Sequence, residues 1–102
     1  MRRAARVDDN QAALVAALRQ LGISVHSTAA LGDGFPDLCV GFRGRNYLLE
    51  VKDPAKVPSK RVLTPDEQDW HTRWTGQVAV VETLEDCLRV LGASGACPPG
   101  TP

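Results

Sequence analysis

Two acidic residues and a lysine stand at the ends of apolar segments. Asp37 directly precedes the apolar run 38–42, Glu50 lies within the run 47–51, and Lys52 follows it. Burying such charges is costly unless they are paired or bind a metal. Two carboxylates give an all-oxygen site, which selects a hard cation such as Mg²⁺ or Mn²⁺. Because such an ion activates water and neutralises phosphodiester charge, these residues predict hydrolysis of a nucleic-acid backbone, with Lys52 holding the attacking water or a phosphate oxygen.

A β-hairpin is expected to bring these side chains together. The two apolar runs are separated by residues 43–46, which are typical of a short closing loop. Pairing of Phe42 with Tyr47 across this loop sets the expected register.

The same register places Asp37 opposite Lys52, and Cys39 opposite Glu50, with all four on one face of the sheet. Diagonal neighbours across a strand pair lie about 7 to 8 Å apart, so Asp37 and Glu50 can share an ion.

The remaining pattern predicts an α/β domain over residues 1–92. Residues 93–102 are rich in Gly and Pro and lack a large hydrophobe, so we expect a disordered tail. The order α, β, β, β, α, β, α predicts a four-stranded sheet covered by helices. The expected elements are a helix over 10–21, strands over 23–26, 38–42 and 47–51, a helix from the Thr64 cap to 75, a strand over 77–81 and a helix over 84–91.

The first helix presents amides, not acids, to the sheet. At about 100° per residue, Asn10 and Gln11 fall on the buried stripe one turn before Leu14, whereas Asp9 points the opposite way. Asn10 or Gln11 is therefore expected near the carboxylates.

Composition excludes several classes of protein. The chain has 102 residues, 12 basic against 12 acidic side chains and three cysteines without a CxxC pair, which argues against a polycation, a disulfide framework or a zinc knuckle. No apolar run is long enough to cross a membrane, so we expect a soluble intracellular protein. Charge is nevertheless uneven, and a basic strip over 43–61 is expected to contact phosphates; its candidate DNA-binding residues are Arg43, Arg45, Lys56, Lys60 and Arg61.

Taken together, these residues resemble the PD-(D/E)xK, or restriction-endonuclease-like, nuclease superfamily. The match consists of 35–37 (Phe-Pro-Asp), a gap of 12 residues, 50–52 (Glu-Val-Lys), a basic loop and the helix start 63–71. It is closest to the small VRR-NUC and Holliday-junction-resolvase-like members often encoded by phages and prophages. The resemblance implies an αβββαβ core with a mixed four-stranded sheet, here followed by a C-terminal helix.

The resemblance also implies roles for individual residues. Asp37 and Glu50 would be metal ligands, and the main-chain carbonyl of Val51 a third. Lys52 would be the catalytic lysine. Gln68 matches a helix glutamine that supports the site.

The first helix departs from the family pattern, in which a glutamate often stands at this place. Asn10 or Gln11 could bind metal through an amide oxygen or a water, and Asp9 only if the helix begins later, so the number of metals stays open. His71 is expected either to contact phosphate or to be a plain surface histidine. Trp70 and Trp74 are expected in the core or an interface, not as platforms for bases.

The function expected from these features is a Mg²⁺- or Mn²⁺-dependent DNA endonuclease selective for branched or flapped structures, with a homodimer as the form that would make paired nicks. Such a protein would work in the cytoplasm of a bacterial or phage-infected cell. Two alternatives stay open: a non-catalytic nucleic-acid-binding or assembly module, and a nuclease subunit of a larger complex. The sequence does not decide between DNA and RNA.

Overall fold

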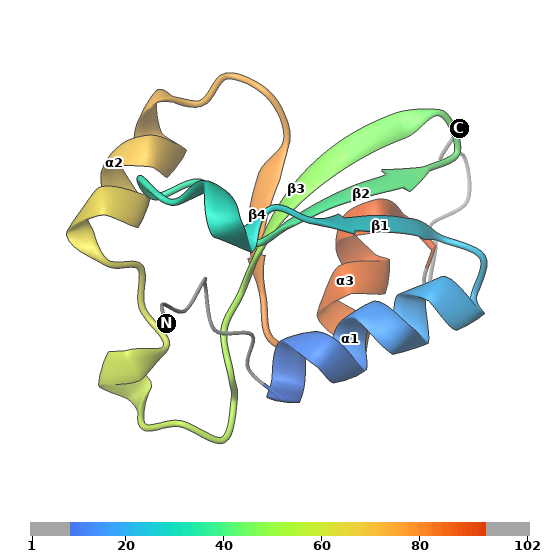
Figure 1. Ribbon diagram of the computed structural model, residues 1–102, viewed down its shortest axis with the longest axis horizontal. Coiled ribbons are helices and arrows are strands. Elements are labelled where there is room, and N and C mark those ends of the chain that lie inside the picture. Colours follow the sequence, from blue (N-terminus) through green and yellow to red (C-terminus); the bar gives the residue numbers. More distant parts are fainter. Residues whose placement is uncertain (1–8, 94–102) are drawn as a thin grey trace.

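The computed structural model describes residues 9–93, which form an α/β fold around one four-stranded sheet (Figure 1). The strand order is β1-β2-β3-β4, with antiparallel pairs except for the parallel pair β3–β4. The expected mixed sheet flanked by helices, with a C-terminal helix, is confirmed. The elements are α1 (Asp9–Gln20), β1 (Ser24–Ser27), η1 (Ala29–Leu31), β2 (Leu38–Phe42), β3 (Arg45–Val51), η2 (Pro58–Lys60), α2 (Pro65–Arg73), β4 (Val78–Val81) and α3 (Leu84–Leu91).

One face of the sheet carries the core. Helices α1 and α3 lie next to each other against this face (Figure 1). Leu38 and Val40 of β2 and Leu49 of β3 point into it and are fully buried, as are Leu18 of α1 and Cys87 of α3. Since side chains alternate along a strand, the intervening residues of β2 and β3, Glu50 among them, point to the opposite face.

The turn between β2 and β3 is tighter than expected. It contains only Arg43 and Gly44, both with positive φ (53° and 79°), as in the two-residue turns that match strand twist. Phe42 therefore pairs with Arg45, and the expected pairing with Tyr47 was wrong by two residues. Because the error is an even number, every side chain keeps its predicted face of the sheet.

Helix α2 begins at the predicted cap. The Thr64 hydroxyl accepts from the Glu67 backbone N–H at 3.2 Å, and Glu67 Oε1 accepts from the Thr64 backbone N–H at 2.9 Å. Two N–H groups at the start of the helix are thereby satisfied. The helix ends at Arg73, two residues earlier than expected.

Helix α2 stands apart from α1 and α3 (Figure 1) and packs on the segment before β2. The Phe35 ring meets the Trp70 ring edge-on with centroids 5.0 Å apart. Gly34 has φ +82°, and a Cβ there would lie 2.5 Å from the Asp66 carbonyl oxygen. Only glycine permits this close approach, which brings α2 near Asp37.

Two expectations fall wholly or partly outside the described residues. These are the extent of the domain before residue 9 and the tail after residue 93. Within residues 9–93, no helix has the length and apolar character needed to cross a membrane.

Candidate active site

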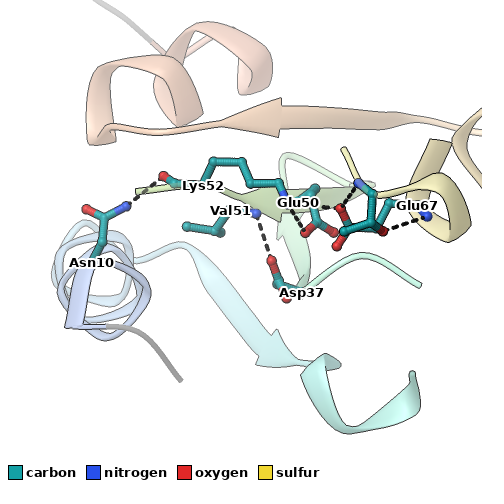
Figure 2. Close-up of polar contacts among 7 residues, drawn as sticks. Asn10, Asp37, Glu50, Val51, Lys52 and Glu67 are labelled. Carbon is teal, nitrogen blue, oxygen red and sulfur yellow. Dashed lines mark hydrogen bonds and ion pairs between the residues drawn. The ribbon is translucent and has the colours of Figure 1, made fainter. Parts of the chain in front are cut away.

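Asp37 lies immediately before β2 and reaches across to the end of β3 (Figure 2). Its Oδ2 accepts the backbone N–H of Val51 at 2.9 Å. The predicted position of Asp37 directly opposite Lys52 was therefore wrong, since the shifted register pairs Leu38 with Leu49. Burial raises the pKa of Asp37, and the Val51 N–H partly offsets this.

Glu50 is the buried acid of the site. It lies in β3 with only 3% of its surface exposed, and burial, followed by the nearby carboxylates of Asp37 and Glu67, raises its pKa to about 9. Its Oε1 is buried and has no hydrogen-bond partner among the described residues. A buried carboxylate oxygen without a partner is costly, so this atom is suited to a proton or a cation. Cys39, expected opposite Glu50, instead pairs with Leu48.

Lys52 lies between two carboxylates (Figure 2). Its Nζ is 2.9 Å from Oε1 of Glu67 and 3.5 Å from Oε2 of Glu50. Burial alone would lower the pKa of Lys52, but these two ion pairs outweigh burial and raise it. The ammonium group is therefore held in its charged form beside the carboxylates of the site.

Glu67, which lies within the expected helix start 63–71 and was not expected at the site, is the α2 residue that contacts Lys52. Burial would raise its pKa, but hydrogen bonds from Lys52 and the Thr64 backbone N–H lower it overall. The adjacent Gln68, expected to support the site, has an exposed side chain. The capping motif was visible in the sequence, but nothing in it indicated that the same carboxylate would also bind Lys52.

Helix α1 places an amide side chain near the carboxylates, as the helical phase predicted. Gln11 is 5% exposed and lines the pocket that contains Asp37 and Glu50, whereas Asp9 is exposed. Asn10 has a different role, because its Nδ2 donates to the carbonyl oxygens of Lys52 at 3.0 Å and Glu82 at 3.1 Å. Asn10 thus ties α1 to the ends of β3 and β4, and Gln11 is the amide that faces the carboxylates.

These side chains surround a pocket of about 240 Å³. Basic side chains from the loop after β3 lie at this pocket, where they would meet an anionic substrate. The lining residues are Gln11, Asp37, Glu50, Val51, Lys52, Asp53, Lys56 and Lys60.

Other members of the basic strip lie elsewhere. Arg61 Nη1 is 3.7 Å from Glu82 Oε1, so its charge faces an acid. Arg43 and Arg45 lie at the closed end of the hairpin, and Arg45 is five residues from Glu50 along β3, a distance of about 16 Å. The strands carry both arginines to the end of the sheet opposite to the carboxylates, so a phosphate contact of Arg43 or Arg45 would lie away from the pocket.

His71 lies on α2 one turn after Glu67. Its Nε2 is buried without a hydrogen-bond partner among the described residues, and burial lowers its pKa. His71 is therefore half-buried and not a plain surface histidine, and its contact with phosphate stays a prediction.

The donor set fits one hard cation better than two. Asp37 and Glu50 supply carboxylate oxygens, and the Oε1 of Glu50 lacks a partner among the described residues. Within residues 9–93, no group of three or more His, Cys, Asp or Glu side chains is arranged to hold a metal ion unaided. The other ligands would be the Val51 carbonyl, the Gln11 amide oxygen or water, as is usual for Mg²⁺.

Comparisons of the chain with protein-family models, curated proteins and solved structures found no match. Function is therefore inferred from the chemistry of the site itself.

Proposed function

We propose that this protein is a divalent-cation-dependent nuclease of the PD-(D/E)xK type that hydrolyses phosphodiester bonds in branched or flapped DNA. The observation that carries the proposal is the convergence of Asp37, Glu50 and Lys52 on one small pocket, at which Lys56 and Lys60 also lie. Acids, a lysine and neighbouring cations are the groups that hydrolysis of a polyanion requires.

In this reaction a water oxygen attacks phosphorus and gives a proton to solvent, and the bond from phosphorus to the leaving oxygen breaks. The leaving oxygen takes up a proton from solvent and departs as a hydroxyl. Asp37 and Glu50 would hold Mg²⁺ or Mn²⁺, with the Val51 carbonyl beside them. The ion supplies an activated water and charge neutralisation when bound. Lys52, kept protonated by Glu67, donates a hydrogen bond to the water or to a non-bridging phosphate oxygen. Gln11 faces the same space and orients water.

A labelled-substrate assay tests the proposal. Junctions, flaps, duplexes and single strands of DNA, and RNA equivalents, are incubated with Mg²⁺, Mn²⁺ or EDTA. Cleavage should require the cation, and Asp37→Asn, Glu50→Gln and Lys52→Ala should each reduce it by about 10² or more. Asp9→Asn is the matched control, because it removes an exposed acid of α1 outside the pocket. Wild-type turnover in any of the three site variants would contradict the assignment.

One observation favours a second candidate, a binding module without catalysis. Lys52 already neutralises Glu67, and a proton satisfies Glu50, so the cluster is stable without a metal. Nucleic-acid binding that is indifferent to EDTA, with no cleavage of any substrate, would support this alternative.

The proposed substrate also implies where and how the protein works. The resemblance to small nucleases that phages and prophages often encode would place the protein in the cytoplasm of a bacterial or phage-infected cell. A homodimer would supply two sites for paired nicks. Sedimentation analysis with and without junction DNA tests the dimer.

A further inference from the structure

Trp70 of helix α2 and Trp74, the residue that directly follows the helix, form a stacked pair of tryptophans. The Trp70 and Trp74 rings have centroids 4.6 Å apart and planes 20° from parallel, and Phe35 meets Trp70 edge-on from the other side. Trp74, at the end of this aromatic array, remains 42% exposed. The sequence favoured core or interface positions for both residues; Trp70 is half-buried, but the described residues do not bury Trp74.

The position of the Trp74 ring is fixed on two sides. One side stacks on Trp70, and its Nε1 lies where a Cβ on Gly76 would be only 2.9 Å away. Among residues 9–93, no second ring stacks on Trp74. A large, flat and exposed ring held in one orientation loses little entropy when another ring binds to it.

The same helix links this ring to the candidate active site. Glu67, Trp70 and Trp74 occupy positions i, i+3 and i+7, which form one stripe along a helix. Glu67 binds Lys52, so the stripe begins at the pocket. With a rise of 1.5 Å per residue, Trp74 lies about 10 Å further along the axis, which is the length of about three stacked nucleotides at about 3.4 Å each.

The local charges favour a nucleic-acid strand over a protein partner. Two of the acids on α2 have cationic partners: Glu67 binds Lys52, and Asp69 binds Arg73 at 3.0 Å. A third, Asp66, lies in the first turn, at the end of the helix away from Trp74. The basic loop with Lys60 leads into the helix and borders the pocket. Lys60 therefore lies at the pocket end of the stripe and Trp74 at its other end. A strand that follows the stripe would meet a cation at its phosphate and an aromatic ring at a base, the two features that are usual in single-strand binding sites.

We propose that Trp74 is a stacking platform for an unpaired base of the strand whose phosphate occupies the pocket. The path of that strand rests on the proposed function. The platform narrows the substrate class to nucleic acid with single-stranded nucleotides next to the cleavage point, such as a flap or a frayed end, because a base within a continuous duplex has no free face to stack.

Intrinsic fluorescence tests the platform without cleavage, because Trp70 and Trp74 are the only tryptophans in the chain. The full chain is titrated in EDTA with a short single-stranded DNA, and with an oligonucleotide of the same length whose sugars lack bases. The two probes have equal phosphate charge. The intact strand should quench the fluorescence and bind about 5- to 150-fold more tightly than the abasic strand.

Trp74→Ala should bind both strands with equal affinity, whereas Leu21→Ala, which removes an exposed leucine at the end of α1, should retain the preference. A Trp74→Phe variant should keep part of the preference, because a smaller ring still stacks, and so guards against misfolding of the alanine variant. Equal affinity of the wild type for both probes would overturn the proposal in favour of charge alone. If the protein self-associates through Trp74 and bases do not change the affinity for the strands, the proposal is overturned, and the exposed ring instead binds a second copy of the protein.

The two probes and the cleavage assay separate this inference from the proposed function. If the wild type prefers the intact strand in EDTA but cleaves no substrate with Mn²⁺, the stacking role of Trp74 is supported and the nuclease proposal is contradicted. If the wild type cleaves DNA but binds both probes with equal affinity, the nuclease proposal is supported and the stacking role of Trp74 is contradicted.

Discussion

Lys52 and Glu67 are joined by an ion pair of 2.9 Å that connects the end of β3 with helix α2. The same Oε1 atom of Glu67 accepts the backbone N–H of Thr64, so one carboxylate oxygen both caps the helix and binds the lysine. A second carboxylate, Glu50, lies 3.5 Å from the lysine on its other side. If a cation engages Glu50, Lys52 still has a partner that fixes its position.

The two roles of Glu67 can be separated by substitution. Glu67→Gln retains the capping box, because glutamine serves at this position, and leaves an amide oxygen for Lys52. Glu67→Ala loses both the capping hydrogen bond and the contact with Lys52. It should lower Tm by about 4 to 8 °C, as expected for a capping loss of about 1 kcal/mol in a domain of this size. We expect cleavage to fall at least tenfold in Glu67→Ala and to be largely rescued in Glu67→Gln.

Thr64→Ala is the control for this prediction. It removes the hydroxyl that accepts the Glu67 N–H but leaves the contact with Lys52. Thermal melts should show that Thr64→Ala lowers Tm about as much as Glu67→Ala does, whereas Thr64→Ala should cleave DNA near the wild-type rate. If Thr64→Ala loses as much activity as Glu67→Ala, Glu67 acts only through the helix.

The raised pKa of Glu50 predicts a pH dependence of stability. Its pKa is about 9 in the folded protein against 4.5 for an unperturbed glutamate, so between these values the folded state holds a proton that the unfolded state lacks. The contribution to stability is complete below pH 4.5 and is lost as the pH rises through 9. The lowered pKa of Glu67 acts only at the acidic end of this range.

Glu50→Gln removes this titration with little change of shape. Its Tm should therefore exceed that of the wild type by a margin that grows from pH 5 to pH 9, measured without divalent ions. Asp53→Asn, which alters an acid after β3 that contacts the Ala55 backbone N–H, should show no such growth. A constant difference between Glu50→Gln and wild type would show that Glu50 is ionised in the folded protein.

Much of this site was accessible from the sequence because period-2 alternation depends only on residue parity. The hairpin register was wrong by two residues, yet Asp37, Glu50 and Lys52 still converged, since an even shift keeps each side chain on its face. The missing information was the turn: an arginine with φ of 53° carries no sequence signal, because glycine or asparagine usually occupies that position.

Other features depended on tertiary contacts that local patterns do not encode. Helix phase correctly placed Gln11 at the carboxylates, but it did not show that Asn10 would bind the carbonyl oxygens of Lys52 and Glu82. The family pattern indicated Gln68, whereas the orientation of α2, set by the close approach at Gly34, turned Glu67 toward the site.

Placement of Gln11 in the pocket predicts how metal affinity responds to charge. Gln11→Glu adds a third carboxylate beside Asp37 and Glu50, so Mn²⁺ should bind more tightly by calorimetry. Asn10→Glu should lose the two carbonyl contacts and destabilise the fold by about 1 to 2 kcal/mol without tightening binding. Asp9→Ala should bind Mn²⁺ like the wild type, and a large loss there would place the missing ligand at Asp9.

The pH dependence of that affinity follows from Glu50. Because the ion displaces the proton that Glu50 holds below pH 9, the dissociation constant for Mn²⁺ should fall about tenfold for each pH unit from 6 to 8. Titrations in buffers of different ionisation enthalpy should report about one proton released. In Glu50→Gln both the pH dependence and the release should disappear, and their persistence would assign the proton to another group.

The two ends of the sheet give a matched test of the basic residues. Lys56 and Lys60 line the pocket, whereas Arg43 and Arg45 lie at the hairpin end, and each pair carries two positive charges. Replacing either pair with alanine changes net charge equally, so bulk electrostatics cannot separate the variants. Each lost contact with a duplex phosphate lowers the slope of log affinity against log salt by about 0.9. The Lys56/Lys60 variant should therefore show a slope reduced by about 1.8, and the Arg43/Arg45 variant a slope near that of the wild type. The opposite result, with the arginine pair controlling the slope, would place the bound strand along the hairpin end and away from Glu50.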